Sequence, residues 1–182
     1  MERDIDRVLI GEQELADQVA DMGNQIARAY TGSEGRITIV TILSGSIIFL
    51  ADLIRVLPMK LRVDLVSVSS YRGKTKKPGS LMLLTERPLD VEGRDVLIVD
   101  DILDTGGTLR LVTAELRRGQ PSSVKTAVLL RKPSKAPSDV KADFVGFDIE
   151  DEFVVGYGLD YDGMYRNLPY VAVLKPEVYG GQ

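Results

Sequence analysis

The sequence predicts an α/β fold in which helices flank a central parallel sheet. Through the first two thirds of the chain, short apolar runs typical of strands alternate with helical patterns, as in consecutive βαβ units. One run, Val96 to Val99, is apolar at every position, which is typical of a strand buried on both faces of a parallel sheet. With 182 residues, 44% of them hydrophobic, the chain is long enough for one domain with its own core.

The composition excludes several kinds of chemistry. The chain contains no cysteine and no histidine, which rules out disulfides, thiolate nucleophiles, histidine triads and Cys/His zinc sites. A net charge of −4 counts against general nucleic-acid binding, so no nucleic-acid partner is expected. The start, Met1 to Asp4, lacks an apolar signal core, and no segment approaches the ~20 apolar residues that span a bilayer. We therefore expect a cytoplasmic protein without a membrane partner.

The first elements are predicted to be a helix, a strand and a second helix. An amphipathic helix is expected from about residue 12 to residue 30, because apolar residues recur there at Leu15, Val19, Met22 and Ile26. Ile37 to Leu43 is a buried-strand candidate, and the apolar helix Ile47 to Leu57 ends before Pro58. The turn between them, Ser44-Gly45-Ser46, either caps the helix or binds an anion through its main-chain N–H groups.

A hairpin is predicted next. Leu61 to Ser69 has the pattern of a strand, and Leu81 to Leu84 can form the returning arm. The connection, Ser70 to Gly79, contains four cationic side chains, two glycines and a proline. Two interpretations stay open for this loop: a solvated hairpin tip, or a lid that closes over an anionic substrate.

The remaining elements divide into a core and a smaller β-rich part. A helical pattern from Leu109 ends near Gly119, and Val124 to Leu130 is one more buried strand. The last third holds three short strand candidates and no convincing helix, at Phe144 to Phe147, Phe153 to Gly158 and Tyr170 to Leu174. We therefore expect a single domain over residues 1–182. Its core spans about residues 35–131, and a small hood forms from the N-terminal residues and about residues 140–182.

The chemistry-bearing stretch follows the central strand. Asp100 and Asp101 are expected where that strand ends, and the turn Asp104 to Thr108 leads into the next helix. Such a turn either merely caps the helix or binds a phosphate, through backbone N–H groups, threonine hydroxyls and the helix dipole, with glycines that let the backbone curl. The aspartates would repel a bare phosphate. They suit a ligand that also carries hydroxyls or arrives with a divalent cation, and a phosphorylated sugar with Mg²⁺ satisfies both conditions.

A family resemblance strengthens this interpretation. The stretch Val96 to Leu109 closely resembles the signature for 5-phosphoribosyl-1-pyrophosphate (PRPP) in type I phosphoribosyltransferases. The segments Phe144 to Ile149, Phe153 to Tyr161 and Tyr165 to Pro169 resemble the hypoxanthine and hypoxanthine-guanine phosphoribosyltransferases. The matching segments occur in matching order from about Val8 to Leu174, which is far more specific than any single motif.

The resemblance implies a type I phosphoribosyltransferase fold and a purine salvage enzyme. In that family, Mg²⁺ is required, and the 5-phosphoribosyl group of PRPP passes to N9 of hypoxanthine or guanine, which gives IMP or GMP and pyrophosphate. The family also implies a homodimer or a homotetramer. Three alternatives stay open: a transferase that prefers xanthine, a regulatory protein that binds RNA or DNA, and a catalytically silent PRPP-binding protein.

The resemblance also implies roles for residues around the sugar phosphate. Asp100 and Asp101 hold the ribose hydroxyls, and Arg166 contacts pyrophosphate. The full set of residues expected to bind PRPP or the nucleotide is Ser44, Gly45, Asp100, Asp101, Ile102, Leu103, Asp104, Thr105, Gly106, Gly107, Thr108 and Arg166. Ser70 and Tyr71 match the start of the family's closing loop.

The base has its own expected set. Asp104 matches the carboxylate that acts as general base or acid at N7 of the purine. Lys132 matches the lysine that donates to the 6-oxo group, Phe153 the ring that stacks on the base, and Val154 the backbone that reads the 2-position. Asp160 resembles the magnesium-linked aspartate and completes the purine-binding set of Lys132, Phe153, Val154 and Asp160. The expected metal residues are Asp100, Asp101 and Asp160.

Two positions depart from the family pattern. Ser44 stands where many relatives have Lys or Arg, and Gly107 stands where some have Lys. The pyrophosphate turn is therefore expected to bind mainly through backbone N–H groups. By the resemblance, the peptide bond between Ser44 and Gly45 is one that can be cis.

Overall fold

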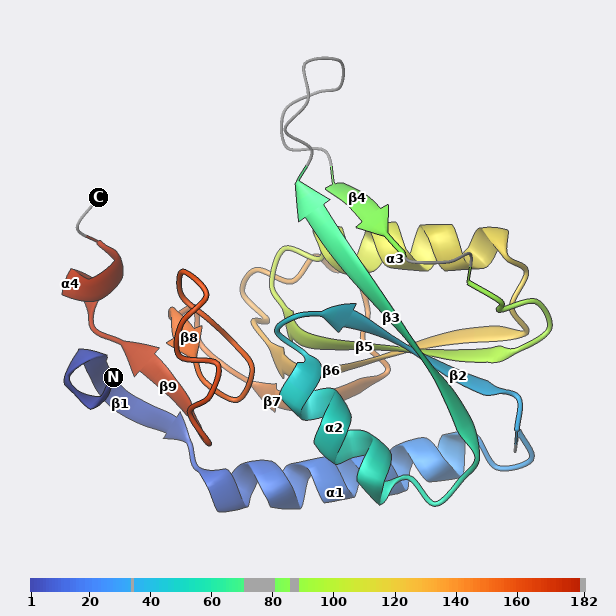
Figure 1. Ribbon diagram of the computed structural model, residues 1–182, viewed down its shortest axis with the longest axis horizontal. Helices are drawn as coiled ribbons and strands as arrows, with labels where there is room; N and C mark the ends of the chain where they lie inside the picture. The colour runs from blue at the N-terminus through green and yellow to red at the C-terminus, as the bar shows by residue number, and fades with distance from the viewer. Residues whose placement is uncertain (34, 71–80, 86–88, 181–182) are drawn as a thin grey trace, which may run out of the picture.

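A computed structural model describes residues 1–33, 35–70, 81–85 and 89–180 of the chain. Within these residues the strands form two sheets, a six-stranded sheet in the order β4-β3-β2-β5-β6-β7 and a three-stranded sheet in the order β1-β9-β8. Figure 1 shows the larger sheet between helices and the smaller sheet to one side of it. The predicted α/β class is confirmed.

The larger sheet is mixed. Its strands are β2 (Ile37–Leu43), β3 (Leu61–Ser70), β4 (Leu81–Leu84), β5 (Asp95–Leu103), β6 (Ser123–Arg131) and β7 (Phe144–Asp148). All neighbouring strands pair in parallel except β3 and β4, which are antiparallel. The parallel sheet is thus confirmed for five strands, and β4 is the returning arm of the predicted hairpin.

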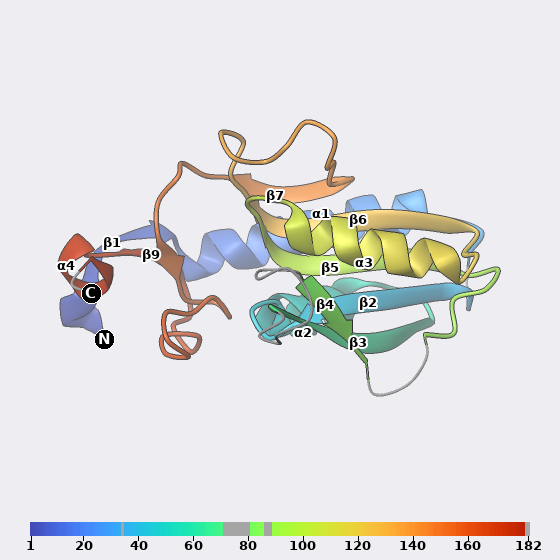
Figure 2. The same ribbon diagram turned by 90° about the horizontal axis from the view of Figure 1, so that it is seen from above.

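Helices cover both faces of this sheet. The helices α1 (Glu12–Ala29) and α2 (Ile47–Val56) pack on one face, and α3 (Gly107–Arg118) packs on the other; Figure 2 shows α3 over the sheet from above. Along β5, Leu97 and Val99 join the cluster with α1 and α2, whereas Val96 and Ile98 join the cluster with α3. The continuous apolar run therefore marks a strand buried on both faces, as predicted.

The three-stranded sheet joins the two ends of the chain. Here β1 (Ile5–Ile10) pairs with β9 (Val171–Leu174), which pairs in turn with β8 (Val154–Val155), all antiparallel. A short 3₁₀ helix (Glu2–Asp4) precedes β1, and α4 (Pro176–Tyr179) follows β9. Residues 1–10 and 171–180 accordingly lie at this sheet, which we call the hood (Figures 1 and 2).

Several expected boundaries need correction. The strand expected to open the hood is β7, which pairs in parallel with β6 and belongs to the larger sheet. The segment is short and follows a turn-rich link, which favoured the hood. The sequence of one strand does not reveal which other strand it pairs with. In addition, β5 runs through Asp100 and Asp101 to Leu103, and α3 begins at Gly107 instead of Leu109.

No helix in the described part of the chain combines the length and apolarity needed to cross a membrane. The cytoplasmic location stays a prediction.

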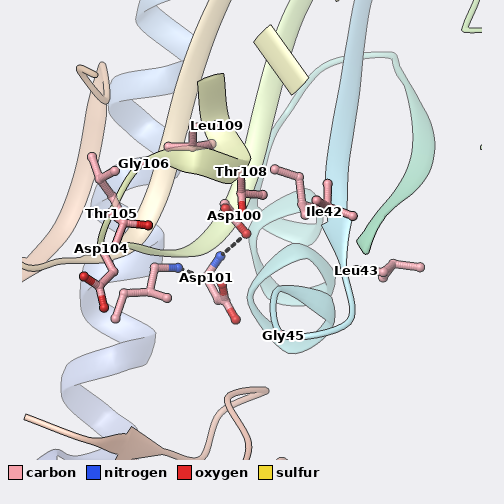
Figure 3. Close-up of a pocket in the computed structure, with 13 residues that line it drawn as sticks. Ile42, Leu43, Gly45, Asp100, Asp101, Asp104, Thr105, Gly106, Thr108 and Leu109 are labelled. Atoms are coloured by element: carbon pink, nitrogen blue, oxygen red, sulfur yellow. Dashed lines mark hydrogen bonds between the residues drawn. The ribbon is translucent and has the colours of Figure 1, made fainter. Parts of the chain in front are cut away.

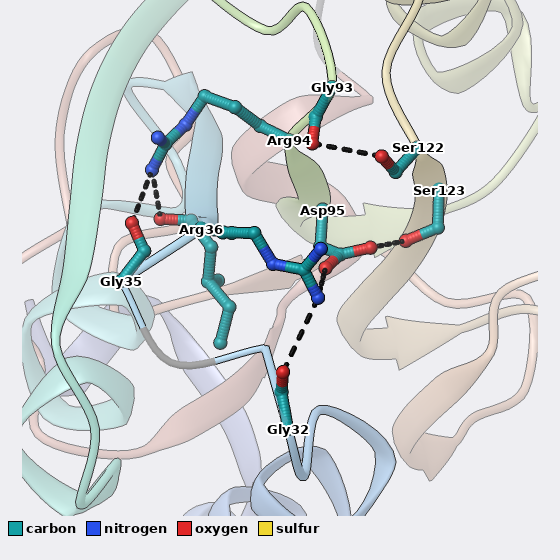
Figure 4. A network of polar contacts seen from close by, with 9 residues as sticks. Gly32, Gly35, Arg36, Gly93, Arg94, Asp95, Ser122 and Ser123 are labelled. Atoms are coloured by element: carbon teal, nitrogen blue, oxygen red, sulfur yellow. Dashed lines mark hydrogen bonds and ion pairs between the residues drawn. The ribbon is translucent and has the colours of Figure 1, made fainter.

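A polar network ties the strands together at the end of the sheet opposite the acidic pair (Figure 4). Arg94 donates from Nε to Thr38 Oγ1 at 2.6 Å and from Nη2 to the Ile37 carbonyl at 3.1 Å. Beside it, Asp95 accepts from Ser123 Oγ at 2.7 Å and pairs with Arg36 at 3.7 Å. The network thus joins β2, β5 and β6 where they begin.

Asp95 contributes stability through its charge. The hydrogen bond from Ser123, helped by Ser33 and the charge of Arg36, lowers the pKa of Asp95 against the opposing effect of burial. A carboxyl with a lowered folded-state pKa adds stability above the pKa of the unfolded chain, and this contribution is lost as pH falls through the folded-state pKa.

We predict that Asp95→Asn destabilises the protein at pH 7 by about 1–3 kcal/mol, since it weakens hydrogen bonds to a charged group. The difference should begin to shrink below about pH 4, where Asp95 becomes protonated in the unfolded chain, and should be lost as pH falls through the lower folded-state pKa. Urea unfolding at several pH values measures the difference in unfolding free energy between the parent chain and the variant. Asp90→Asn is the control, because Asp90 is 78% exposed in its ion pair with Arg62 and should change stability by less than about 0.5 kcal/mol. Equal effects of the two variants would contradict this account.

Candidate active site

A cavity of about 270 Å³ lies where β5 ends and α3 begins (Figure 3). The turn that lines it depends on Gly106, whose φ of 72° is left-handed, a conformation that glycine adopts without strain. A Cβ added to Gly106 would also come within 3.0 Å of Val140 Cγ2. The side chains of Thr105 and Thr108 line the same cavity, so backbone and hydroxyl donors surround a space suited to a phosphate.

Two carboxylates line this cavity, of which Asp100 is buried and Asp101 is partly buried. Asp100 Oδ1 accepts from the Asp101 backbone N–H at 3.1 Å, and Asp101 Oδ1 accepts from the Ile102 N–H at 2.8 Å. Burial, with the negative charge of Asp101 close by, raises the pKa of Asp100 well above its usual range. Burial also raises the pKa of Asp101, although hydrogen bonds and the charge of Arg166 oppose this rise. The pair therefore favours a ligand that brings hydroxyl groups or positive charge.

Glycines allow three segments to meet beside the acidic pair. A Cβ added to Gly45 would overlap the Asp101 carboxylate, and one added to Gly158 would overlap the Gly45 carbonyl oxygen. Gly158 also has a φ of +103°, which a side chain would strain. The turn after β2, the end of β5 and the turn after β8 are consequently in direct contact, and no side chain larger than glycine fits between them.

Arg166 links the hood to this contact. Its guanidinium donates from Nη1 to the Gly158 carbonyl at 2.6 Å and pairs through Nη2 with Asp160 Oδ1 at 2.7 Å. The other carboxylate oxygen of Asp160 accepts from the Gly163 N–H at 2.8 Å. Because Arg166 also lowers the pKa of Asp101, its charge acts on the acidic pair.

A second cavity, of about 540 Å³, lies between the end of β5 and the hood. Its lining includes Ile102, Lys132, Phe153, Val154 and Tyr179. Three of these residues, Lys132, Phe153 and Val154, belong to the set expected to bind a purine, whereas Asp160, the fourth member of that set, does not line this cavity.

Lys132 is held between carboxylates in this second cavity. The residue is only 8% exposed, and its Nζ lies 3.2 Å from Asp151 Oδ1 and 3.6 Å from Asp104 Oδ2. Asp151 also pairs with Lys135 Nζ at 2.9 Å. Hydrogen bonds from Lys135 and then Lys132 lower the pKa of Asp151. A buried ammonium between two acids suits a charged donor to a ligand oxygen.

Asp104 belongs to both cavities. Together with Ile102 it lines the cavity at the α3 turn and the cavity beneath the hood. Figure 3 shows that its carboxylate and that of Asp101 point to different sides of the strand end. Asp104 Oδ1 is buried and has no hydrogen-bond partner within the described residues. A buried acceptor without a partner is uncommon in folded proteins and is typical of strained or catalytic positions.

Comparison with known proteins gives the family. The model of the phosphoribosyl transferase domain matches residues 10–162. The chain belongs to the phosphoribosyl transferase domain family. A hypoxanthine-guanine phosphoribosyltransferase of Bacillus subtilis (strain 168) is 43% identical over 179 residues, which cover 98% of each chain.

Solved structures of related phosphoribosyltransferases agree with this assignment. The crystal structure of a hypoxanthine phosphoribosyltransferase from Staphylococcus aureus is 41% identical, with a TM-score of 0.89 over 98% of this chain and 96% of that one. A hypoxanthine-guanine phosphoribosyltransferase from Bacillus anthracis is 37% identical, with a TM-score of 0.85 over 94% and 98% of the two chains. The expected type I phosphoribosyltransferase fold is confirmed.

The fold of this phosphoribosyl transferase domain gathers most of the expected site residues, and leaves some apart. The cavity at the α3 turn is lined by Gly45, Asp100, Asp101, Ile102, Leu103, Asp104, Thr105, Gly106 and Thr108. Ser44, Gly107 and Arg166 do not line it, although Ser44 and Gly107 flank lining residues in the chain. Tyr71 lies outside the described residues, as does the rest of the loop after Ser70, so its two interpretations stay predictions.

Two further expectations concern a metal residue and a peptide bond. Among the described residues, no three acidic side chains gather into a metal-binding group, and the magnesium-linked role of Asp160 stays a prediction. Asp160 is held by Arg166 and the Gly163 N–H. The cis peptide bond joins Leu43 to Ser44, one residue before the bond between Ser44 and Gly45 that the resemblance indicated. The adjacent turn residue that contacts Asp101 is Gly45.

Sequence patterns did not predict several residues of the second cavity, among them Asp151, Lys135 and Tyr179. Asp151 and Lys135 complete the row of charges around Lys132, and Tyr179 reaches the cavity from α4. Their place depends on contacts between distant parts of the chain. One local signal was present, since Lys135 follows Lys132 within the same turn, where it hydrogen bonds backbone to backbone at 3.0 Å.

We predict that Asp100→Asn raises the melting temperature in the absence of ligand. A raised folded-state pKa makes the folded protein less stable as pH increases through that range, and asparagine removes the charge while its Oδ1 can still accept from Asp101. Each kcal/mol gained should raise Tm by about 2–4 °C in a chain of this size. The gain should be largest above neutral pH and vanish below about pH 4, where Asp100 is protonated in both states. A lower Tm at pH 8 would contradict this prediction.

Proposed function

We propose that this chain transfers the 5-phosphoribosyl group of PRPP to N9 of hypoxanthine or guanine, giving IMP or GMP and pyrophosphate in purine salvage. The observation that carries the proposal is that Asp104 and Ile102 line both cavities. A sugar phosphate in one cavity would therefore have its C1 facing a base in the other. The named relatives, which are hypoxanthine and hypoxanthine-guanine phosphoribosyltransferases, support the choice of base.

The cavity at the α3 turn is assigned to the 5′-phosphate and the ribose. Backbone N–H groups from Thr105 to Thr108, the hydroxyls of both threonines and the N-terminus of α3 would bind the phosphate. Asp100 and Asp101 would accept hydrogen bonds from the ribose hydroxyls. Binding these hydroxyls offsets the burial of the two acids, which otherwise raises the pKa of both groups.

The donor set at the acidic pair fits a Mg²⁺ ion that arrives with its substrate. Magnesium sites commonly use one or two carboxylates and take their remaining ligands from water and substrate oxygens, and Asp100 and Asp101 both line the cavity. When bound, the ion would neutralise charge on the departing pyrophosphate. The role of Asp160 as a magnesium-linked residue stays a prediction.

The second cavity is assigned to the base. Lys132 would donate to the 6-oxo group of hypoxanthine or guanine, and an ammonium donor disfavours the 6-amino group of adenine. Phe153, whose side chain is 37% exposed, would stack on the ring. The backbone of Val154, in β8, would read the 2-position. The ratio of hypoxanthine to guanine use is left to experiment.

Asp104 is assigned the role of accepting the proton from N7 of the base. Asp104 lines both cavities, and its Oδ2 lies 3.6 Å from Lys132 Nζ, so the carboxylate lies beside the group assigned to the 6-oxo oxygen and would face N7. Loss of the N7 proton to Asp104 would make N9 a better nucleophile. N9 would then bond to C1 of the ribose as the bond from C1 to pyrophosphate breaks, so the leaving group carries away the electron pair.

The pyrophosphate end would be bound by the turn after β2 and by Arg166. Ser44 is exposed and brings no charge where many relatives carry a cation, so backbone N–H groups of this turn would do most of the binding. The homodimer or homotetramer implied by the resemblance stays a prediction.

A panel of bases tests the proposed function. Purified protein is incubated with PRPP, Mg²⁺ and one of hypoxanthine, guanine, xanthine, adenine or uracil, and nucleotide formation is followed. We expect IMP and GMP, with little product from adenine or uracil. Failure to turn over any 6-oxopurine would refute the proposal, and faster turnover of xanthine than of the other two would favour the xanthine-preferring alternative.

We predict that Asp104→Asn lowers kcat by about 10²–10⁴-fold, the usual contribution of general acid–base catalysis. The affinity for PRPP, measured by calorimetry, should change far less, because asparagine keeps the shape of the phosphate turn. Asp139→Asn is the matched control, since Asp139 pairs with Arg110 and lines neither of the two cavities. Equal losses in kcat and PRPP affinity would contradict the assigned role.

A further inference from the structure

The C-terminal helix α4 brings an aromatic residue to the base cavity. The Tyr179 ring stacks on the Phe153 ring, with centroids 5.0 Å apart and planes 21° from parallel. Both side chains line the cavity that holds Lys132 and Asp104. Neither the family motifs nor the sequence pattern assigns a role to Tyr179.

We propose that Tyr179 is a positioning residue for base binding: it holds the Phe153 ring in the orientation that stacks on the purine. This inference rests on the proposed function. Tyr179 stacks on one face of the Phe153 ring, and we assign the base to the other face. The base itself would touch Phe153, and Tyr179 would act through that ring.

Phe153 needs such support because its own burial is slight. Its side chain is 37% exposed, and an exposed aromatic side chain samples several rotamers that base binding must restrict. Tyr161 also contacts the Phe153 ring in an edge-to-face arrangement, with centroids 5.5 Å apart and planes at 90°. Stacked and edge-to-face pairs at these distances are both favourable, so the two tyrosines orient Phe153 before a base arrives.

Hydrogen bonds and packing hold α4, and with it Tyr179, against the rest of the hood. The Lys175 N–H donates to the Asp4 carbonyl at 2.9 Å, and Lys175 Nζ donates to the Arg3 carbonyl at 2.8 Å. Tyr179 also packs on the hood cluster of Val155, Tyr165, Leu168 and Leu174. These contacts fix α4 to the N-terminal residues.

Strand β9 connects the two rings through the backbone. Leu174, the last residue of β9, donates its N–H to the Phe153 carbonyl at 3.1 Å. Phe153 and the start of α4 are therefore anchored to the same strand end, which keeps the distance between the two rings nearly constant. This connection allows Tyr179 to restrain Phe153 without moving the turn that surrounds the phosphate.

The test compares steady-state kinetics of the parent chain, Tyr179→Ala and Tyr179→Phe. We expect Tyr179→Ala to raise KM for hypoxanthine and guanine about three- to tenfold, which corresponds to the usual strength of an aromatic pair. KM for PRPP and kcat should change by less than about twofold. Tyr179→Phe should restore the parent values, because the stack needs the ring and not the hydroxyl. In a Phe153→Ala background, Tyr179→Ala should have no further effect on KM for the base.

Val178→Ala is the matched control. Val178 lies beside Tyr179 in α4 and packs on the hood cluster, but it does not line the base cavity. It should leave KM for the base unchanged, and its Tm shows how much truncation in α4 costs. If Tyr179→Ala lowered Tm much more than Val178→Ala and impaired PRPP and base binding alike, the role would be structural and the proposal would be overturned.

Other outcomes are equally decisive. An unchanged KM for the base in Tyr179→Ala, with an active parent chain, would overturn this inference and leave the proposed function standing. A lower KM would mean that Tyr179 competes with the base, which also overturns it. An inactive parent chain would overturn the proposed function, and the inference with it.

Discussion

Two carboxylates at the end of a strand buried on both faces are the constraint on which the site depends. Burying Asp100 and Asp101 costs free energy, which appears as the raised pKa of each group. The surroundings then have to supply hydrogen bonds and positive charge, from the backbone N–H groups of β5 and from Arg166. A sugar with free hydroxyls supplies the rest. The site is thus unfavourable for the empty protein and complementary to its ligand.

The two ends of β5 illustrate opposite uses of an aspartate. At the start of the strand, hydrogen bonds from Ser123 and Ser33 and the charge of Arg36 lower the pKa of Asp95, so its ionisation stabilises the fold. At the other end, burial raises the pKa of Asp100, so its ionisation opposes folding. The stability that ionised Asp95 contributes therefore offsets part of the free-energy cost of ionised Asp100. Because the two residues lie at opposite ends of β5, substitutions at one should change stability independently of substitutions at the other.

Sequence reasoning was most successful where the chemistry is continuous along the chain. The strand Val96 to Val99, the acids after it and the glycine at position 106 are neighbours, so local patterns predicted their arrangement. Lys132 and Phe153 could be assigned only through a family resemblance, since a lysine or a phenylalanine alone is far more often a surface or core residue. Asp151 and Tyr179 escaped prediction because only tertiary contacts bring them to the base cavity. The partner of β7 was missed for the same reason: pairing is a property of two strands, and each strand shows only its own pattern.

The hood is closed by one of the longest-range pairings in the chain. Strand β1 pairs with β9 in the register Ile5 with Leu174 and Ile10 with Val171. The first strand in the chain can therefore pair only after β9 has been synthesised. During synthesis, residues 5–10 leave the ribosome long before their partner exists, and closing so large a loop is entropically costly. The larger sheet, whose strands are mostly close in sequence, can form first. In a nascent chain, the cavity assigned to the phosphate would then form before the cavity assigned to the base.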